Sequence, residues 1–189
     1  MAHHVMDGKM PVTAVQGLLS GLGHPIIGPD HFAAMVAVGF LAAAHRTSSW
    51  LVLGYVLAMI AGAALHVQGA TVPGAEILVA LSVLALGGAT MQWRNALGEK
   101  AMLALFVIAG AINGYALGES ISGAEPTPLY AYFAGLAIVQ SAVGLAAMTF
   151  ARALAARDTA LIPVSVRLVG AGVAGIGLAM LSKGMIPGA

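Results

Sequence analysis

The fold class is decided by the stretch WLVLGYVLAMIAGAALHV, residues 50–67, which holds no aspartate, glutamate, lysine or arginine. An α-helix rises about 1.5 Å per residue, so roughly 20 apolar residues are needed to cross a hydrocarbon core of about 30 Å. The stretch comes close to that length without a charged side chain. It therefore predicts a helix that crosses a membrane.

The rest of the chain has the composition of the same class. Of its 189 residues, 60% are hydrophobic and 8% are charged, and the mean hydropathy is +0.95. A soluble domain of this size needs many more charged side chains on its surface, so the expected partner is the lipid bilayer. A net charge of +1 gives no argument for nucleic acid, and the absence of cysteine excludes disulfides and thiolate metal sites.

Further apolar runs, separated by short polar turns, predict the other spans. Another apolar stretch, residues 11–23, precedes Gly23-His24-Pro25 and Gly28-Pro29, so we expect a broken or re-entrant segment at residues 11–31. After an N-terminal tail, residues 1–10, we expect one transmembrane domain, residues 11–189. The sequence predicts an all-α, polytopic transmembrane helix bundle of about six spans, at residues 27–44, 50–67, 73–92, 100–117, 128–150 and 163–181.

Basic residues concentrate in alternate connections between these spans. Three connections hold five of the eight lysines and arginines: Arg46, Arg94, Lys100, Arg152 and Arg157. The connections between them, residues 67–73 and 117–128, hold none. Because basic loops face the cytoplasm and the number of spans is even, both termini are expected outside it. We therefore expect a multi-pass protein of the bacterial inner membrane with an extracytoplasmic tail and C-terminus.

This orientation gathers the metal-ligating side chains in the outer half of the membrane. Seven residues are candidates: His24, Asp30 and His31 at the outer end of the first span, then His66, Glu76, Asn113 and Glu119 at or near the outer ends of later spans. Random placement would scatter such residues over both halves. The clustering predicts a polar site that opens outward.

The segment GHPIIGPDH, residues 23–31, concentrates two imidazoles and a carboxylate. These donors together suit Ni²⁺, Co²⁺, Zn²⁺ and Cu²⁺. The prolines and glycines of the segment are expected to turn the backbone and bring the two histidines together with Asp30. For Asp30 alone two roles stay open, that of a metal ligand and that of an N-cap for the following helix.

His24, Pro25, Gly28, Asp30 and His31 form the pattern His-Pro-x-x-Gly-x-Asp-His. In this motif, in length and in number of spans the chain resembles the HupE/UreJ family of nickel and cobalt permeases. The resemblance implies a secondary permease that takes up Ni²⁺ or Co²⁺ from the extracytoplasmic side through this segment. The divalent transition metal is then the substrate, with copper and zinc left open as further cargo.

The fourth span departs from the family's pattern. Relatives usually read His-Gly-x-x-His-Gly-x-Glu, whereas residues 113–119 read NGYALGE, so the glycines persist and both histidines are replaced. Asn113 and Glu119 remain as oxygen donors, and Gln140 stands in the fifth span where relatives often carry a further histidine. The departure leaves a second interpretation open: a non-transporting membrane subunit, metal sensor or metallochaperone that retains the permease fold.

The N-terminus suggests a further site. A free amine, two backbone amides and a histidine at position three form a square-planar site for Cu²⁺ or Ni²⁺, and His3 and His4 both suit this pattern. The tail is expected to capture metal or to be a plain polar tail. No His-Glu-x-x-His motif is present, so we expect no enzyme. Small-residue helix faces leave open a homo-oligomer or a partner in a membrane complex.

Overall fold

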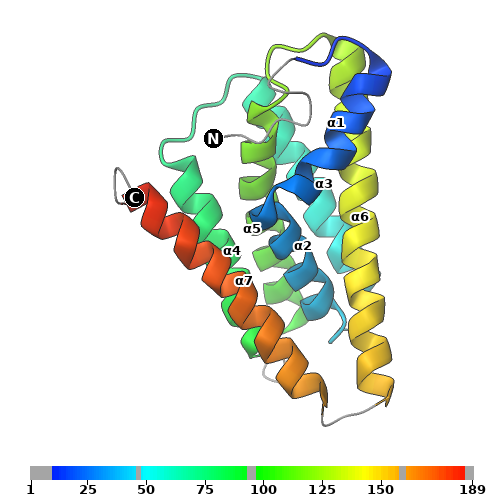
Figure 1. The fold of residues 1–189 in the computed structure, drawn as a ribbon, viewed down its shortest axis with the longest axis vertical. Helices are drawn as coiled ribbons and strands as arrows, with labels where there is room; N and C mark the ends of the chain where they lie inside the picture. The colour runs from blue at the N-terminus through cyan, green and yellow to red at the C-terminus, as the bar shows by residue number, and fades with distance from the viewer. Residues whose placement is uncertain (1–9, 46–47, 93–96, 158–160, 186–189) are drawn as a thin grey trace.

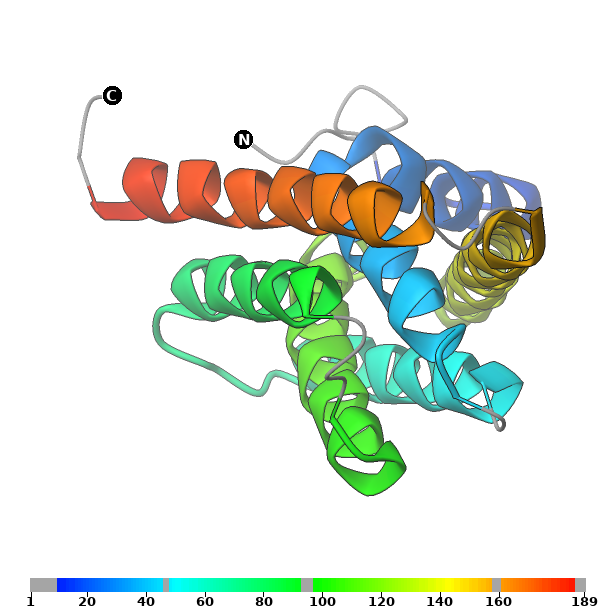
Figure 2. The same ribbon diagram turned by 90° about the horizontal axis from the view of Figure 1, so that it is seen from below.

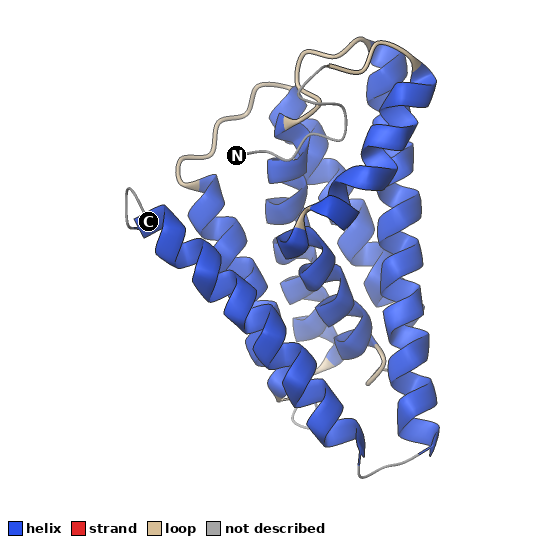
Figure 3. Ribbon diagram, in the orientation of Figure 1, coloured by secondary structure: helices blue, strands red, loops and turns tan. Residues whose placement is uncertain are grey.

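The computed structural model describes residues 10–45, 48–92, 97–157 and 161–185, and all regular secondary structure within these ranges is helical (Figure 3). The described helices are α1 Ala14–Ile27, α2 Pro29–Ala42, α3 Ser48–Val67, α4 Ala75–Met91, α5 Glu99–Glu119, α6 Pro126–Arg157 and α7 Leu161–Met185. The prediction of an all-α fold is confirmed.

Most of the helices have the length and composition of membrane spans. The helices α3, α5, α6 and α7 are each long and apolar enough to cross a membrane. The helices α1 and α2 pass the same test together, as one pair bent by 78°. The apolar helix α4 has 17 residues, at the short end of the range of about 17–25 that a span requires. The described helices therefore agree with the predicted polytopic bundle of about six spans.

The break in the first span falls at Gly28, between α1 and α2. Gly28 has an extended backbone, with φ −79° and ψ 103°, as expected for a residue that precedes a proline. The predicted break at Gly23-His24-Pro25 is wrong, and the helix expected from residue 27 begins at Pro29. The helix α1 continues past Pro25 because that residue is buried among neighbouring helices, and the Gly28 N–H still donates to the His24 carbonyl at 2.9 Å.

Three closely packed helix pairs surround α2. The pairs are α1 with α6, α3 with α5, and α4 with α7, and α2 contacts members of all three (Figures 1 and 2). The helix is covered on most sides, with no exposure at Ala34, Met35, Ala37, Val38, Leu41 and Ala42. A helix enclosed in this way carries apolar residues all round. At its N-terminal end, directly after the break, α2 buries His31 against the bundle, whereas Pro29 and Phe32 are exposed.

The bent pair crosses the bundle along α6. The start of α1 lies on the start of α6, where a Cβ at Gly17 would overlap the Pro128 carbonyl. Further along, α2 lies on the middle of α6, where a Cβ at Gly39 would meet the Gly144 carbonyl. Both helices therefore advance in the same direction as α6. This arrangement favours a broken span over a re-entrant loop at residues 11–31.

The two ends of the bundle differ in charge. We call the end with the α3–α4 and α5–α6 loops the upper end, as it stands in Figure 1, and the opposite end the lower end. At the lower end α5 and α7 begin and α6 ends. Four basic residues lie at or near this end, together with Glu99: Lys100, Arg152, Arg157 and Arg167. Glu76, Glu119 and Glu125 lie at the upper end, toward which Lys183 closes α7.

Glycines set the close approach of α3 and α5, which run in the same direction. Three glycines of α5, spaced four residues apart, meet three carbonyl oxygens of α3: Gly110 meets Tyr55, Gly114 meets Met59 and Gly118 meets Ala63. A Cβ added at any of them would overlap or press on backbone, which cannot rotate away. Small residues at this spacing let two membrane helices touch along their backbones.

Substituting alanine for Gly114 should therefore destabilise the bundle. The added Cβ would overlap the Met59 carbonyl, and forcing extra volume into a packed contact costs about 1–3 kcal/mol. The matched control is Gly175→Ala on α7, where no atom stands within 4 Å of the added methyl, so stability should be unchanged or slightly higher. Thermal unfolding in detergent measures both; equal stability of the two variants would contradict the packing argument.

Candidate metal-binding site at the break in the first span

Asp30 and His31 lie in the first turn of α2, directly after the break at Gly28. His31 is 6% exposed, and the Asp30 side chain is 18% exposed. The N-cap of α2 is Gly28, and no side chain caps the helix, so the alternative role of Asp30 as an N-cap is wrong. Its carboxylate still stands at the positive end of the helix dipole, where a negative charge is stabilised.

A chain of hydrogen bonds links His31 to α5 and α4. Asn113 of α5 is 1% exposed, and its Oδ1 lies 3.3 Å from His31 Nδ1. The Asn113 amide nitrogen donates to the Ala109 carbonyl at 2.8 Å and to Ser82 Oγ at 2.9 Å. The Ser82 hydroxyl in turn donates to the Val79 carbonyl at 2.8 Å. Side chains from three helices thus meet at the break.

This chain fixes which nitrogen of His31 carries a proton. The Ala109 carbonyl can only accept, so the amide NH₂ of Asn113 must face it and the amide oxygen must face His31. His31 Nδ1 is then the donor, and in the neutral ring Nε2 keeps its lone pair. An outer hydrogen bond that orients an imidazole in this way is typical of histidines that bind metals.

The free nitrogen of His31 faces a carboxylate. His31 Nε2 lies 3.6 Å from Asp30 Oδ2, which is too far for a hydrogen bond. Two acceptor atoms at this distance repel each other. The pair is favourable only when a cation, either a proton on the ring or a metal ion, stands with it. Two ligand bonds of about 2.0–2.1 Å to one ion can span this separation.

His24 lies beside this pair, on the last turn of α1. Its ring is 6.2 Å from the His31 ring, measured between centroids, and it meets the ring of Tyr132 edge-on at 6.5 Å. The Tyr132 hydroxyl donates to the Leu117 carbonyl at 2.9 Å, so the wall behind His24 is held in place. The segment therefore places His24 beside His31 and His31 beside Asp30, and the turn between the two helices comes from Gly28.

The remaining candidate residues lie apart from this cluster. His66, at the upper end of α3, packs on the Tyr115 ring at 4.5 Å, and its Nδ1 is buried without a hydrogen-bond partner. Glu76 and Glu119 are exposed. His3 and His4 fall outside the described residues.

No three histidine, aspartate or glutamate side chains of the described residues converge on one metal position. A metal ion at the break would therefore have the Asp30–His31 pair as its protein ligands, with His24 adjacent. Asn113, expected as an oxygen donor, instead has every polar atom bonded to protein and orients His31.

Comparison with known proteins agrees with the motif. The sequence profile of the family described as "HupE / UreJ protein" matches residues 1–180. The chain belongs to the HupE/UreJ family. Its members are associated with nickel and cobalt transport, and the family is one of transporters. The chain is also 42% identical over 73 residues to "Protein HupE" of Rhizobium leguminosarum bv. viciae, and the match covers 38% of this chain and 38% of that protein. No solved structure matches.

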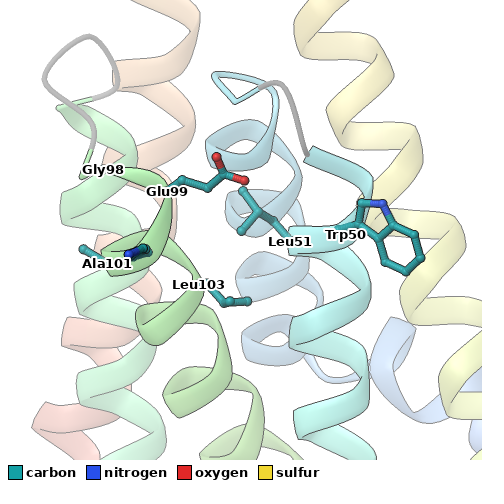
Figure 4. Close-up of a pocket in the computed structure, with 7 residues that line it drawn as sticks. Trp50, Leu51, Gly98, Glu99, Ala101 and Leu103 are labelled. Atoms are coloured by element: carbon teal, nitrogen blue, oxygen red, sulfur yellow. The ribbon is translucent and has the colours of Figure 1, made fainter.

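A pocket of this HupE/UreJ member lies far from the cluster. It has a volume of about 810 Å³ and stands at the first turns of α3 and α5, which belong to the lower end of the bundle and are drawn uppermost in Figure 4. Its lining is mostly apolar and includes Trp50, Leu51 and Leu103, with Glu99 and Lys100 at the first turn of α5. Trp50 is 75% exposed, as is common for tryptophans at a membrane interface. The pocket offers one carboxylate and no imidazole, so it does not resemble the candidate metal site at the break.

The sequence interpretation missed Ser82 and Tyr132. Both are polar residues in largely apolar helices, and periodicity alone cannot say which neighbour they bond. Gln140, which stands in the fifth predicted span where relatives often carry a histidine, is 1% exposed in the core. The one available signal was the presence of a polar side chain at mid-span, which in a membrane nearly always faces protein.

Replacing Asn113 by leucine should destabilise the protein by about 1–3 kcal/mol, because the buried His31 Nδ1–H loses its acceptor and Ser82 loses its donor. The side chains are similar in size, so packing changes little. The matched control is Thr149→Val, which removes an exposed hydroxyl that bonds only to carbonyls of its own helix. Unfolding in detergent should separate the two, and an Asn113→Leu protein as stable as the control would contradict the assigned role.

Proposed function

We propose that this chain is a secondary permease that takes up Ni²⁺ or Co²⁺ from the extracytoplasmic side of the bacterial inner membrane. The observation that carries the proposal is the break at Gly28, which sets a carboxylate and an oriented imidazole inside an apolar bundle. Ionisable groups in such surroundings are unfavourable unless they serve a cation or each other. Membership in a transporter family supports the same conclusion.

The donor set suits transient binding of a divalent transition metal. Imidazole and carboxylate oxygen are ligands that Ni²⁺, Co²⁺, Zn²⁺ and Cu²⁺ all accept, so copper and zinc compete for the same pair. Two protein ligands hold an ion less firmly than the three or four of a structural site. A permease needs this balance, because an ion that binds too tightly does not leave. Broken helices frame the substrate site in other secondary transporters.

The orientation in the membrane follows from charge. The basic residues of the described helices concentrate at the lower end, apart from Lys183 near the end of α7. By the positive-inside rule the lower end faces the cytoplasm, and both termini lie outside it. The break at Gly28 is then approached from the upper, extracytoplasmic end, where His66 and Glu119 stand as candidates for first contact with metal.

A second candidate function is a non-transporting membrane subunit, metal sensor or metallochaperone. It is favoured by one observation, the engagement of Asn113 at a position where relatives carry histidine. A fixed amide there holds His31 still, and it offers no second ligand onto which an ion can move.

Uptake should depend on His31. In proteoliposomes loaded with a fluorescent indicator of divalent metals, His31→Ala should lower the initial rate of Ni²⁺ or Co²⁺ entry at least about tenfold, the loss expected for one charge-assisted ligand. Thr149→Val, on the exposed face of α6, serves as the control and should match the parent. Equal rates in His31→Ala and the parent would reject this pathway. Absence of flux in all three, together with a stoichiometric partner on purification, would favour the second candidate function.

The orientation can be tested separately, because the chain contains no cysteine. We expect Glu125→Cys, in the exposed upper connection, to react with a membrane-impermeant maleimide on intact spheroplasts. Gly98→Cys, exposed at the lower end with no atom within 4 Å of the added Cβ, should react only after permeabilisation. The reverse pattern would invert the proposed direction of uptake.

A further inference from the structure

Tyr55 of α3 is a fully buried residue whose hydroxyl makes no contact that the fold needs. Its relative exposure is 0%, and its hydroxyl has no hydrogen-bond partner among the described residues. A buried hydroxyl without a partner normally destabilises a protein, since the group has lost water and gained nothing. By contrast, the equally buried Tyr132 bonds to the Leu117 carbonyl and to Ser120.

Packing alone does not explain why this residue is tyrosine. The ring of Tyr55 meets Phe106 edge-on at 6.4 Å, and its backbone carbonyl receives the close approach of Gly110. A phenylalanine at this position would make both contacts. These contacts therefore do not account for the hydroxyl group of Tyr55.

The surroundings of Tyr55 point to the break in the first span. Val52 lies one turn below Tyr55 on α3. The side chains of Val52 and of Met35 on α2 both lie where a Cβ on Gly144 of α6 would stand. Met35 lies little more than one turn below Asp30 on α2. Because Tyr55 lies one turn above Val52, and Asp30 lies above Met35, Tyr55 stands near the level of the Asp30–His31 pair.

We propose that the Tyr55 hydroxyl accepts a hydrogen bond from a water molecule bound to the metal ion that Asp30 and His31 hold. This inference rests on the proposed function and adds a positioning residue to it. Octahedral Ni²⁺ and Co²⁺ take six ligands, and the Asp30–His31 pair supplies few of them, so water completes the shell. Metal-bound water is a strong donor and needs an acceptor inside an apolar bundle. The phenol oxygen is such an acceptor, with no partner until the ion arrives.

Tyr55→Phe separates this role from a structural one, because its two effects have opposite signs. Without metal the variant should melt a few degrees higher than the parent in detergent, since an unpartnered buried hydroxyl is removed. With metal it should bind Co²⁺ about tenfold more weakly by titration calorimetry, the loss expected for one hydrogen bond to a charged group. The Co²⁺ absorption bands in the visible should keep their positions, because the atoms bound to the metal are unchanged.

Two tyrosine variants serve as controls. Tyr132→Phe removes a hydroxyl that has partners, so it should melt lower than the parent. Tyr130→Phe changes a 69% exposed side chain and should leave both melting and Co²⁺ affinity unchanged. Parent-like Co²⁺ affinity in Tyr55→Phe would overturn the inference while leaving the permease intact, and so would a shift of the Co²⁺ bands, which would make Tyr55 a direct ligand. A parent that binds no Co²⁺ would overturn both proposals.

Discussion

A helix broken inside an apolar bundle is the constraint on which this structure depends. The first span bends by 78° at Gly28, and the following Pro29 has no N–H with which to continue the backbone hydrogen bonding. Unpaired backbone groups in a hydrocarbon environment cost several kcal/mol each. The neighbouring helices cover one side of the break, where His24, Pro25 and His31 are buried, whereas Ile26, Ile27 and Phe32 stay exposed on the other side. The three helix pairs stand around α2 (Figure 2). The apolar residues on all sides of α2 follow from this central position.

The same break creates an electrostatic site. The first turn of α2 presents unpaired amides and the positive end of a helix dipole, which together stabilise the Asp30 carboxylate. His31 follows at once and is oriented by Asn113, so a lone pair and a negative charge face one another at 3.6 Å. Such a pair attracts cations more strongly than either group alone. The chemistry is thus a result of backbone geometry and of one amide from a distant helix.

Sequence patterns predict the parts of this molecule that follow from local rules. The apolar runs predict the helix bounds to within about four residues, because a span must match the thickness of the membrane; the exception is α6, which continues past residue 150 to Arg157. The pattern His-Pro-x-x-Gly-x-Asp-His predicts where imidazole and carboxylate meet. The sequence does not reveal that α1 continues through Pro25, because the cover that permits it comes from α6. Nor does it reveal that Asn113 orients His31, since that contact joins residues 82 positions apart.

The site and the helix packing are coupled through α5. Asn113 stands between Gly110 and Gly114, whose missing side chains let α5 rest on the carbonyls of α3. A single methyl group at either glycine would push α5 away from α3, and Asn113 would move with it. The imidazole of His31 would then lose the amide that holds its Nε2 toward Asp30. Glycines outside the Asp30–His31 pair thereby control the orientation of His31, and the geometry of the pair depends on how closely two helices approach.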